Sequence, residues 1–162
     1  MLAYLSAMTI GSCDWEYVEP VLNQLATLER NSPVKPILDS IFKDKRLICC
    51  VSASKGFNEI IETLGGCGER QRAEEFTKRI EVLPDSELPE DMQHRLQIGG
   101  KIKPRSLAIF SFGICQKALT VTANEAFIRS SRMQGIDIPS FVHEARPLSE
   151  QKESRAKQLL QQ

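Results

Sequence analysis

The most apolar helix of the chain is predicted over residues 104–119, which read PRSLAIFSFGICQKAL. Proline is favoured in the first turn of a helix, so Pro104 marks its start. Apolar side chains then fall on nearly every face, a pattern typical of a helix that is surrounded by protein. We therefore expect this helix to be buried at the centre of the fold. Its predicted core residues are Leu107, Ile109, Phe110, Ile114 and Leu119.

The residues after this helix allow two interpretations. Thr120, Val121 and Thr122 are β-branched, which favours a break in the helix. Thr122-Ala-Asn-Glu125 matches a capping box, in which the hydroxyl and the carboxylate each satisfy a free backbone N–H, so a second helix is predicted to begin there. The competing interpretation is one continuous helix over residues 104–134.

Helical periodicity also recurs through most of the sequence before this helix. Ser54 can cap a helix that ends before Gly65-Gly66. Residues 47–51, LICCV, form either a buried connection or the one strand of the chain, and we favour the connection. At the other end of the chain, residues 149–162 are predicted to form a polar helix.

Together these patterns predict an all-α fold. We expect a single-domain bundle of about six to eight helices around the central helix that starts near Pro104. The length of 162 residues, with 41% hydrophobic and 26% charged residues, is sufficient for one domain with its own core. The predicted domain covers residues 1–147, and residues 148–162 are a polar terminal helix or a mobile tail that can dock on a partner.

Charge is distributed unevenly along a chain in which 21 basic side chains balance 21 acidic ones. Residues 95–135 carry seven basic side chains and one acidic one, whereas residues 1–94 carry ten basic and sixteen acidic ones. This split indicates that the ligand is a polyanion, an acidic partner or another copy of the chain. Free N–H groups and the helix dipole at a helix start also favour anions. The candidate nucleic-acid-binding residues are Lys101, Lys103 and Arg105 at the start of the central helix, and Arg129 and Arg132 on one face of the next.

The sequence contains no motif that identifies a reaction. The two histidines, His94 and His143, lie outside recognisable catalytic patterns. Residues 65–70 have the glycines of a phosphate cradle, but Glu69 stands where a phosphate requires a cation. Five cysteines, without a CxxC pair, indicate free thiols in a reducing compartment, the cytoplasm or alternatively the nucleus. We therefore expect no enzymatic activity, cofactor, metal site or membrane span.

The predicted function is non-enzymatic binding of RNA or another polyanion. Phe110, Phe112 and Phe127 fall in apolar helical contexts and are expected in the core, so contacts to phosphates should outweigh contacts to bases. Head-to-tail self-assembly through the acidic and basic regions would make the protein nucleocapsid-like or scaffold-like. The alternative from another class is an adaptor that binds a partner protein through a groove or its C-terminal helix. In the remaining interpretation, the cations are solvated or pair with the acidic first half of the chain.

Overall fold

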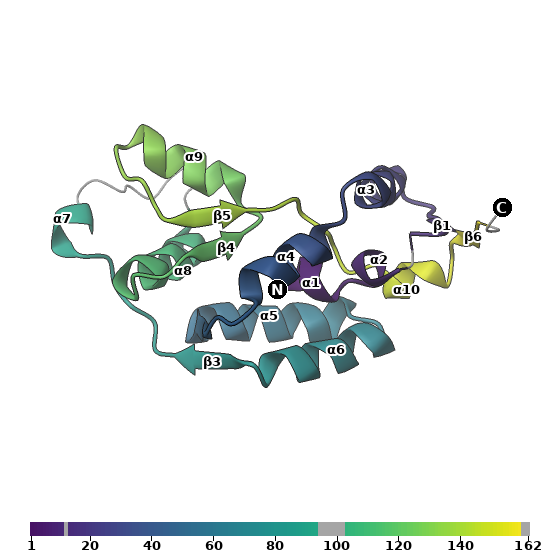
Figure 1. The fold of residues 1–162 in the computed structure, drawn as a ribbon, viewed down its shortest axis with the longest axis horizontal. Helices are drawn as coiled ribbons and strands as arrows, with labels where there is room; N and C mark the ends of the chain where they lie inside the picture. The colour runs from purple at the N-terminus through teal and green to yellow at the C-terminus, as the bar shows by residue number, and fades with distance from the viewer. Residues whose placement is uncertain (12, 94–102, 160–162) are drawn as a thin grey trace. The chain divides into compact units, whose positions relative to one another are not determined.

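The computed structural model describes residues 1–11, 13–93 and 103–159 (Figure 1). Among these, 55% of the residues are helical and 12% lie in strands. The chain forms two compact units, and each combines segments that are separated in the sequence. The first unit comprises Met1–Leu47, Phe57–Glu81 and Ala145–Gln162, and the second comprises Ile48–Gly56 and Val82–Glu144.

The first unit is mainly helical. The long helix α5 (Val51–Leu64) begins in the residues of the second unit and continues into those of the first. A short antiparallel pair of strands joins the two ends of the described sequence, with Trp15 opposite Gln158 and Glu16 opposite Lys157. The other elements of this unit are α1 (Leu2–Leu5), α2 (Ala7–Ile10), β1 (Trp15–Glu16), α3 (Pro20–Asn31), α4 (Val34–Phe42), α6 (Cys67–Thr77), α10 (Glu150–Glu153) and β6 (Lys157–Gln158).

Two apolar clusters form the core of the first unit. In the larger cluster, the ring centroid of Tyr4 lies 4.6 Å from that of Phe76 and 5.4 Å from that of Phe42. Leu5 and Phe57 are buried in the same cluster, which therefore connects α1, α4, α5 and α6. A smaller cluster packs α2 and the residue after β1 against α3 through buried residues, namely Met8, Tyr17, Leu22 and Ala26.

The second unit contains a parallel strand pair. Val121 in β4 pairs with Phe141 in β5, and α9 connects the two strands in the sequence. Parallel strands require such a crossover. The rings of Phe110 and Phe127 stack in the core with centroids 4.0 Å apart and planes inclined by 7°. The elements of this unit are α7 (Glu90–Gln93), α8 (Pro104–Cys115), β4 (Thr120–Thr122), α9 (Glu125–Met133) and β5 (Ser140–Val142).

The all-α prediction is wrong, because the chain combines helices with small sheets. Residues 47–51 were expected to be a connection, but β2 (Leu47–Cys50) is a strand that pairs with β3 (Ile80–Leu83). The strands described are between two and four residues long. A strand of this length is too short to show clear hydrophobic alternation, so its formation depends on a partner elsewhere in the chain.

The central helix is partly as predicted. It begins at Pro104, but it ends at Cys115. Phe110 is buried at 2% exposure, whereas Leu119 lies beyond the helix and is 55% exposed. The predicted capping box at Thr122 is wrong, because Thr122 ends β4 and α9 is capped by Asn124.

Other helix boundaries also differ from the sequence interpretation. The helix predicted to start at Ser54 begins at Val51, although it ends at Leu64 as expected. The polar helix predicted over residues 149–162 is a short helix, α10, followed by β6. The division of the chain at residues 147 and 148 stays a prediction.

Two further features concern the whole described sequence. None of its helices has the length and hydrophobicity needed to cross a bilayer.

The five cysteines are free, and burial raises the pKa values of the Cys13, Cys49 and Cys50 thiols. These three side chains are therefore protonated thiols rather than activated thiolates near neutral pH.

Candidate nucleic-acid interface

The start of α8 carries two of the predicted contact residues. Lys103 is the N-cap residue in an extended conformation, and Arg105 lies in the first turn. In the described part of the chain, no side chain caps this helix, and its first backbone hydrogen bond runs from the Leu107 N–H to the Lys103 carbonyl at 2.9 Å. The N–H groups of Arg105 and Ser106 precede that bond, so the helix start favours an anion.

Arg105 lies against the first part of α5, which belongs to the same unit up to Gly56. The Arg105 side chain covers Gly56, which is buried although Arg105 itself is exposed. A Cβ built on Gly56 would lie 1.6 Å from Nη2 of Arg105 and 2.3 Å from its Cζ. The guanidinium therefore occupies the space that any other side chain at position 56 would need.

A polar contact connects the start of α8 with the start of α9. The Asn124 side chain accepts a hydrogen bond from the Phe127 N–H at 3.1 Å, and its amide donates to Oγ of Ser106 at 3.3 Å. The backbone N–H of His143, directly after β5, donates to the Thr122 carbonyl at 2.9 Å. The carboxyl ends of β4 and β5 therefore lie close to the start of α8, and such ends are common ligand-binding positions in α/β folds.

We call these residues the α8 site: Lys103, Arg105, Ser106, Asn124 and Gly56. Two of them were predicted from the regional charge. The other three were missed, because an asparagine, a serine and a glycine carry no signal for a binding site until the fold brings them together. The sequence indicated a helix start that favours an anion, but not the residues that surround it.

A carboxylate lies one helical turn from Gly56 along α5. Oδ2 of Asp85 accepts a hydrogen bond from the Ser52 hydroxyl at 2.6 Å, and Oδ1 accepts one from the Ser52 N–H at 3.0 Å. These two hydrogen bonds, with the hydroxyl as the larger cause, lower the pKa of Asp85 below its ordinary value. Since Ser52 and Gly56 are four residues apart, they share one face of α5. Asp85 thus caps α5, and both of its oxygens are engaged.

This cap should make stability depend on pH in the acidic range. Because the pKa of Asp85 is lower in the folded state, its contribution is present above the ordinary aspartate pKa and is lost as the pH falls through the folded value. We expect the melting temperature of the wild type to fall more steeply below about pH 4 than that of Asp85→Asn. Ser52→Ala should weaken the same dependence. Identical pH profiles for all three proteins would contradict this assignment.

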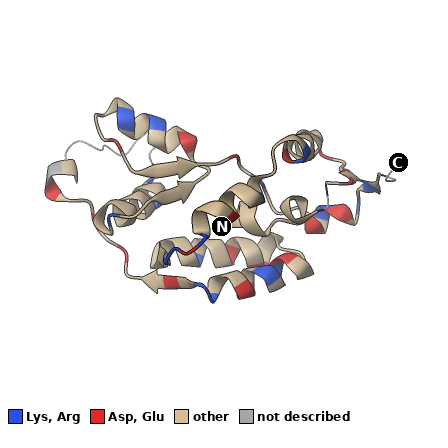
Figure 2. Cartoon of the chain, in the orientation of Figure 1, with Lys and Arg blue, Asp and Glu red and all other residues tan. Residues whose placement is uncertain are grey.

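The remaining predicted contact residues are not equivalent. Arg129 and Arg132 are exposed on α9, whose ribbon carries basic residues after an acidic start (Figure 2). Arg132 pairs with Asp137 at 3.1 Å, whereas Arg129, Lys103 and Arg105 form no ion pair among the residues that the structure describes. Lys101 lies outside the described residues. Arg132 is therefore the weakest candidate of the four that can be placed.

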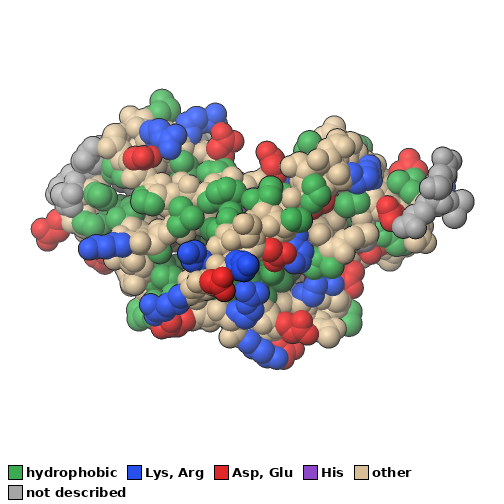
Figure 3. All heavy atoms as spheres, in the orientation of Figure 1, with side chains coloured by type: hydrophobic (Ala, Val, Ile, Leu, Met, Phe, Trp, Pro, Cys, Tyr) green, Lys and Arg blue, Asp and Glu red, His purple; other side chains and the backbone are tan. Residues whose placement is uncertain are grey.

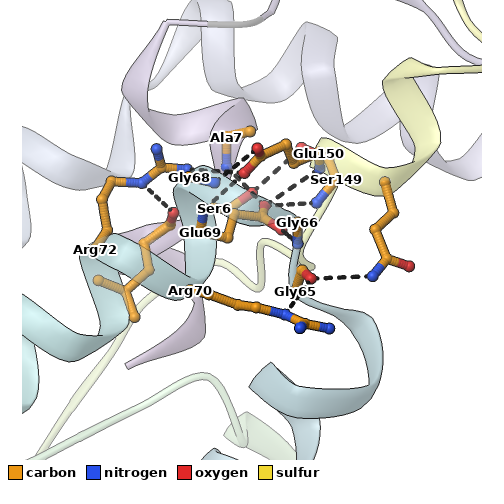
Figure 4. A network of polar contacts seen from close by, with 12 residues as sticks. Ser6, Ala7, Gly65, Gly66, Gly68, Glu69, Arg70, Arg72, Ser149 and Glu150 are labelled. Atoms are coloured by element: carbon orange, nitrogen blue, oxygen red, sulfur yellow. Dashed lines mark hydrogen bonds and ion pairs between the residues drawn. The ribbon is translucent and has the colours of Figure 1, made fainter.

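A second polar cluster, in the first unit, involves the buried carboxylate of Glu69 (Figure 4). Oε1 of Glu69 accepts hydrogen bonds from the N–H groups of Ala7 and Ser149, both at 2.9 Å, and of Glu150 at 3.3 Å. Its Oε2 accepts from the Gly66 N–H at 3.1 Å. One side chain thus connects α2, α6 and α10, which are far apart in the sequence.

Glu150 occupies the start of α6. Its carboxylate oxygens accept from the N–H groups of Gly68 at 2.8 Å and Glu69 at 2.6 Å, and Nη2 of Arg72 lies 3.7 Å away (Figure 4). A Cβ on Gly66 would lie 2.6 Å from the Glu150 side chain, so this glycine permits the close approach. The glycine turn does bind an anionic group, but that group is a carboxylate of the same chain.

The first unit also contains a buried ion pair. Nε of Arg146 lies 2.7 Å from Oε2 of Glu29, and the two side chains are 0% and 3% exposed. Oε1 of Glu29 accepts from the Val34 N–H at the start of α4. Nη1 of Arg146 donates to the Ala145 carbonyl. These contacts fix the segment after β5 to α3 and α4 and are structural in character.

On the face shown in Figure 3, basic side chains are interspersed with acidic and hydrophobic ones. Several acids of the first unit form ion pairs within that unit, including Asp39 with Lys35 and Glu81 with Arg46. Within residues 1–11, 13–93 and 103–159, no three His, Cys, Asp or Glu side chains are grouped so that they could hold a metal ion.

Comparison with known proteins identifies the family but not an activity. The chain belongs to the DUF1308 family, described as proteins of unknown function, and the family model matches residues 1–157. No solved structure matches the chain. The match therefore covers both compact units, and function has to be inferred from the site.

Proposed function

We propose that the protein binds the phosphate backbone of RNA, or a similar polyanion, through the α8 site. Lys103 and Arg105 supply positive charge, and the N–H groups at the start of α8 supply donors for phosphate oxygens. Arg129 on α9 can extend the contact. Because aromatic residues such as Phe110 and Phe127 are buried in the core, the interaction should depend weakly on base sequence.

The observation that carries this proposal is the state of Arg105. Arg105 is exposed, its guanidinium packs on Gly56, and it has no ion-pair partner among the described residues. An arginine in this state can donate two parallel hydrogen bonds to a phosphate. By contrast, Arg132 is engaged by Asp137 and Arg146 by Glu29, so neither guanidinium is equally available.

Replacing Arg105 with Gln should weaken binding of a fluorescently labelled single-stranded oligouridylate about tenfold at low salt, the order expected for one charge-assisted hydrogen bond. Fluorescence anisotropy at several salt concentrations measures both affinity and slope. The slope of log affinity against log salt should decrease by about 0.7, because one phosphate contact to a single strand is lost. Lys103→Gln should give a smaller loss in the same direction.

Arg79→Gln is the matched control, because it removes an exposed arginine from the first unit. It should leave affinity within about twofold of the wild type if binding is local to the α8 site. Equal losses for Arg79→Gln and Arg105→Gln would indicate a diffuse electrostatic effect and contradict the proposed site. If the wild type fails to bind at low salt, polyanion binding is wrong and the adaptor class gains support.

A further inference from the structure

We infer that Gly56 is a positioning residue for Arg105, because the absence of a side chain at this position lets the guanidinium lie on the surface of α5. This inference rests on the proposed function, in which Arg105 contacts phosphate. It assigns a role in ligand binding to a residue that carries no charge and no polar side chain.

The guanidinium of Arg105 leaves little space for a side chain at position 56. A Cβ on Gly56 would come within 1.6 Å of Nη2, 2.3 Å of Cζ and 3.0 Å of Nε of Arg105. Ordinary contact begins at 3.4 Å, so Nη2 would have to retreat by about 2 Å. The three nearest atoms all belong to the guanidinium group, and none belongs to the backbone. The closest obstacle to a side chain at position 56 is therefore the guanidinium of Arg105.

The guanidinium, and not the helix, should give way when a side chain is added. Gly56 lies inside α5 and does not have the positive φ that would strain another residue. Alanine is the best helix former and glycine one of the poorest, so alanine suits the backbone at this position. The end of an arginine side chain moves readily because it has several rotatable bonds. Gly56→Ala should thus preserve folding and displace Arg105.

Displacement should lower affinity without changing the number of charges. A guanidinium held by packing loses less rotamer freedom on binding than one that moves freely, and it presents its N–H groups in a fixed fork. Once displaced, Arg105 still attracts phosphate through its charge. Affinity should fall at every salt concentration while the salt slope stays the same and the melting temperature does not fall. A folding defect would lower the melting temperature as well.

The experiment compares Gly56→Ala, Arg105→Gln and the double variant with the wild-type chain. The labelled oligouridylate is titrated at several salt concentrations, and thermal melting is recorded for each protein. Gly56→Ala should bind about three- to tenfold more weakly with an unchanged slope, and its melting temperature should be equal to or above that of the wild type. The double variant should bind like Arg105→Gln, because the two positions act through one contact. Asn58→Ala, an exposed change on the same helix, should bind like the wild type.

The outcomes separate the two proposals. If Arg105→Gln weakens binding and Gly56→Ala does not, the positioning role is wrong and the proposed function stands. If Arg105→Gln binds like the wild type, both are wrong. Independent losses that add in the double variant would overturn the positioning role, because Gly56 would then act without Arg105. Failure of Gly56→Ala to fold would also overturn it, since that result would show that the backbone yields instead of the guanidinium.

Discussion

Replacing Glu69 with Ala should lower the free energy of unfolding by about 3–5 kcal/mol, a loss at the upper end for single substitutions. The carboxylate accepts hydrogen bonds from four backbone N–H groups, those of Ala7, Gly66, Ser149 and Glu150. Each buried donor left without an acceptor costs about 1–3 kcal/mol, and partial access to water reduces the sum. The loss arises from unmade hydrogen bonds more than from the missing side-chain volume.

Glu69→Gln is the matched control for this prediction. A Gln oxygen in the place of Oε1 keeps three of the four hydrogen bonds, and its amide then faces the Gly66 N–H. We expect the free energy of unfolding of Glu69→Gln to lie between those of the wild type and Glu69→Ala, as measured by urea unfolding followed by circular dichroism. If Glu69→Ala unfolds at the same urea concentration as the wild type, water replaces the carboxylate and the network contributes little.

Arg146→Met should also lower the free energy of unfolding strongly, because it leaves the buried carboxylate of Glu29 without its ion-pair partner. Only 3% of the Glu29 side chain is exposed, and removal of one partner from a buried pair typically costs about 3–5 kcal/mol. Urea unfolding of Arg146→Met and of the wild type at neutral pH measures the loss in the free energy of unfolding.

A double substitution tests whether this pair acts as a unit. Removing both charges with Glu29→Met and Arg146→Met should cost less than the sum of the single substitutions, because neither charge is then buried alone. The Val34 N–H still loses its acceptor, so some destabilisation should remain. Strictly additive costs would show that the two side chains contribute independently and would contradict a coupled pair.

The sequence predicted those features of the fold that depend on neighbouring residues. Pro104 starts α8 because the constraint of its ring acts on its own φ angle, and α5 ends before Gly65-Gly66 for a similarly local reason. The fold class could not be predicted, because Thr120–Thr122 becomes a strand only by pairing with Ser140–Val142. The β-branched residues of this segment indicated a break in the helix, but not the strand with which they pair.

The same distinction applies to the candidate site. Lys103 and Arg105 could be placed at a helix start because they flank Pro104. The contact between Arg105 and Gly56 could not be predicted, because it joins two helices that are separate in the sequence. Likewise, no local sequence signal indicated that the Glu150 carboxylate accepts hydrogen bonds from the glycine turn.

The interleaved order of the two units has a consequence for the growing chain on the ribosome. Residues Val82–Glu144 of the second unit are made before Ala145–Gln162, the last segment of the first. Glu29 and Glu69 are therefore synthesised long before Arg146 and Ser149, their partners. Domains tend to fold as units in the order of synthesis. The second unit should thus complete its core while the first, although begun earlier, still waits for its closing segment to leave the ribosomal tunnel.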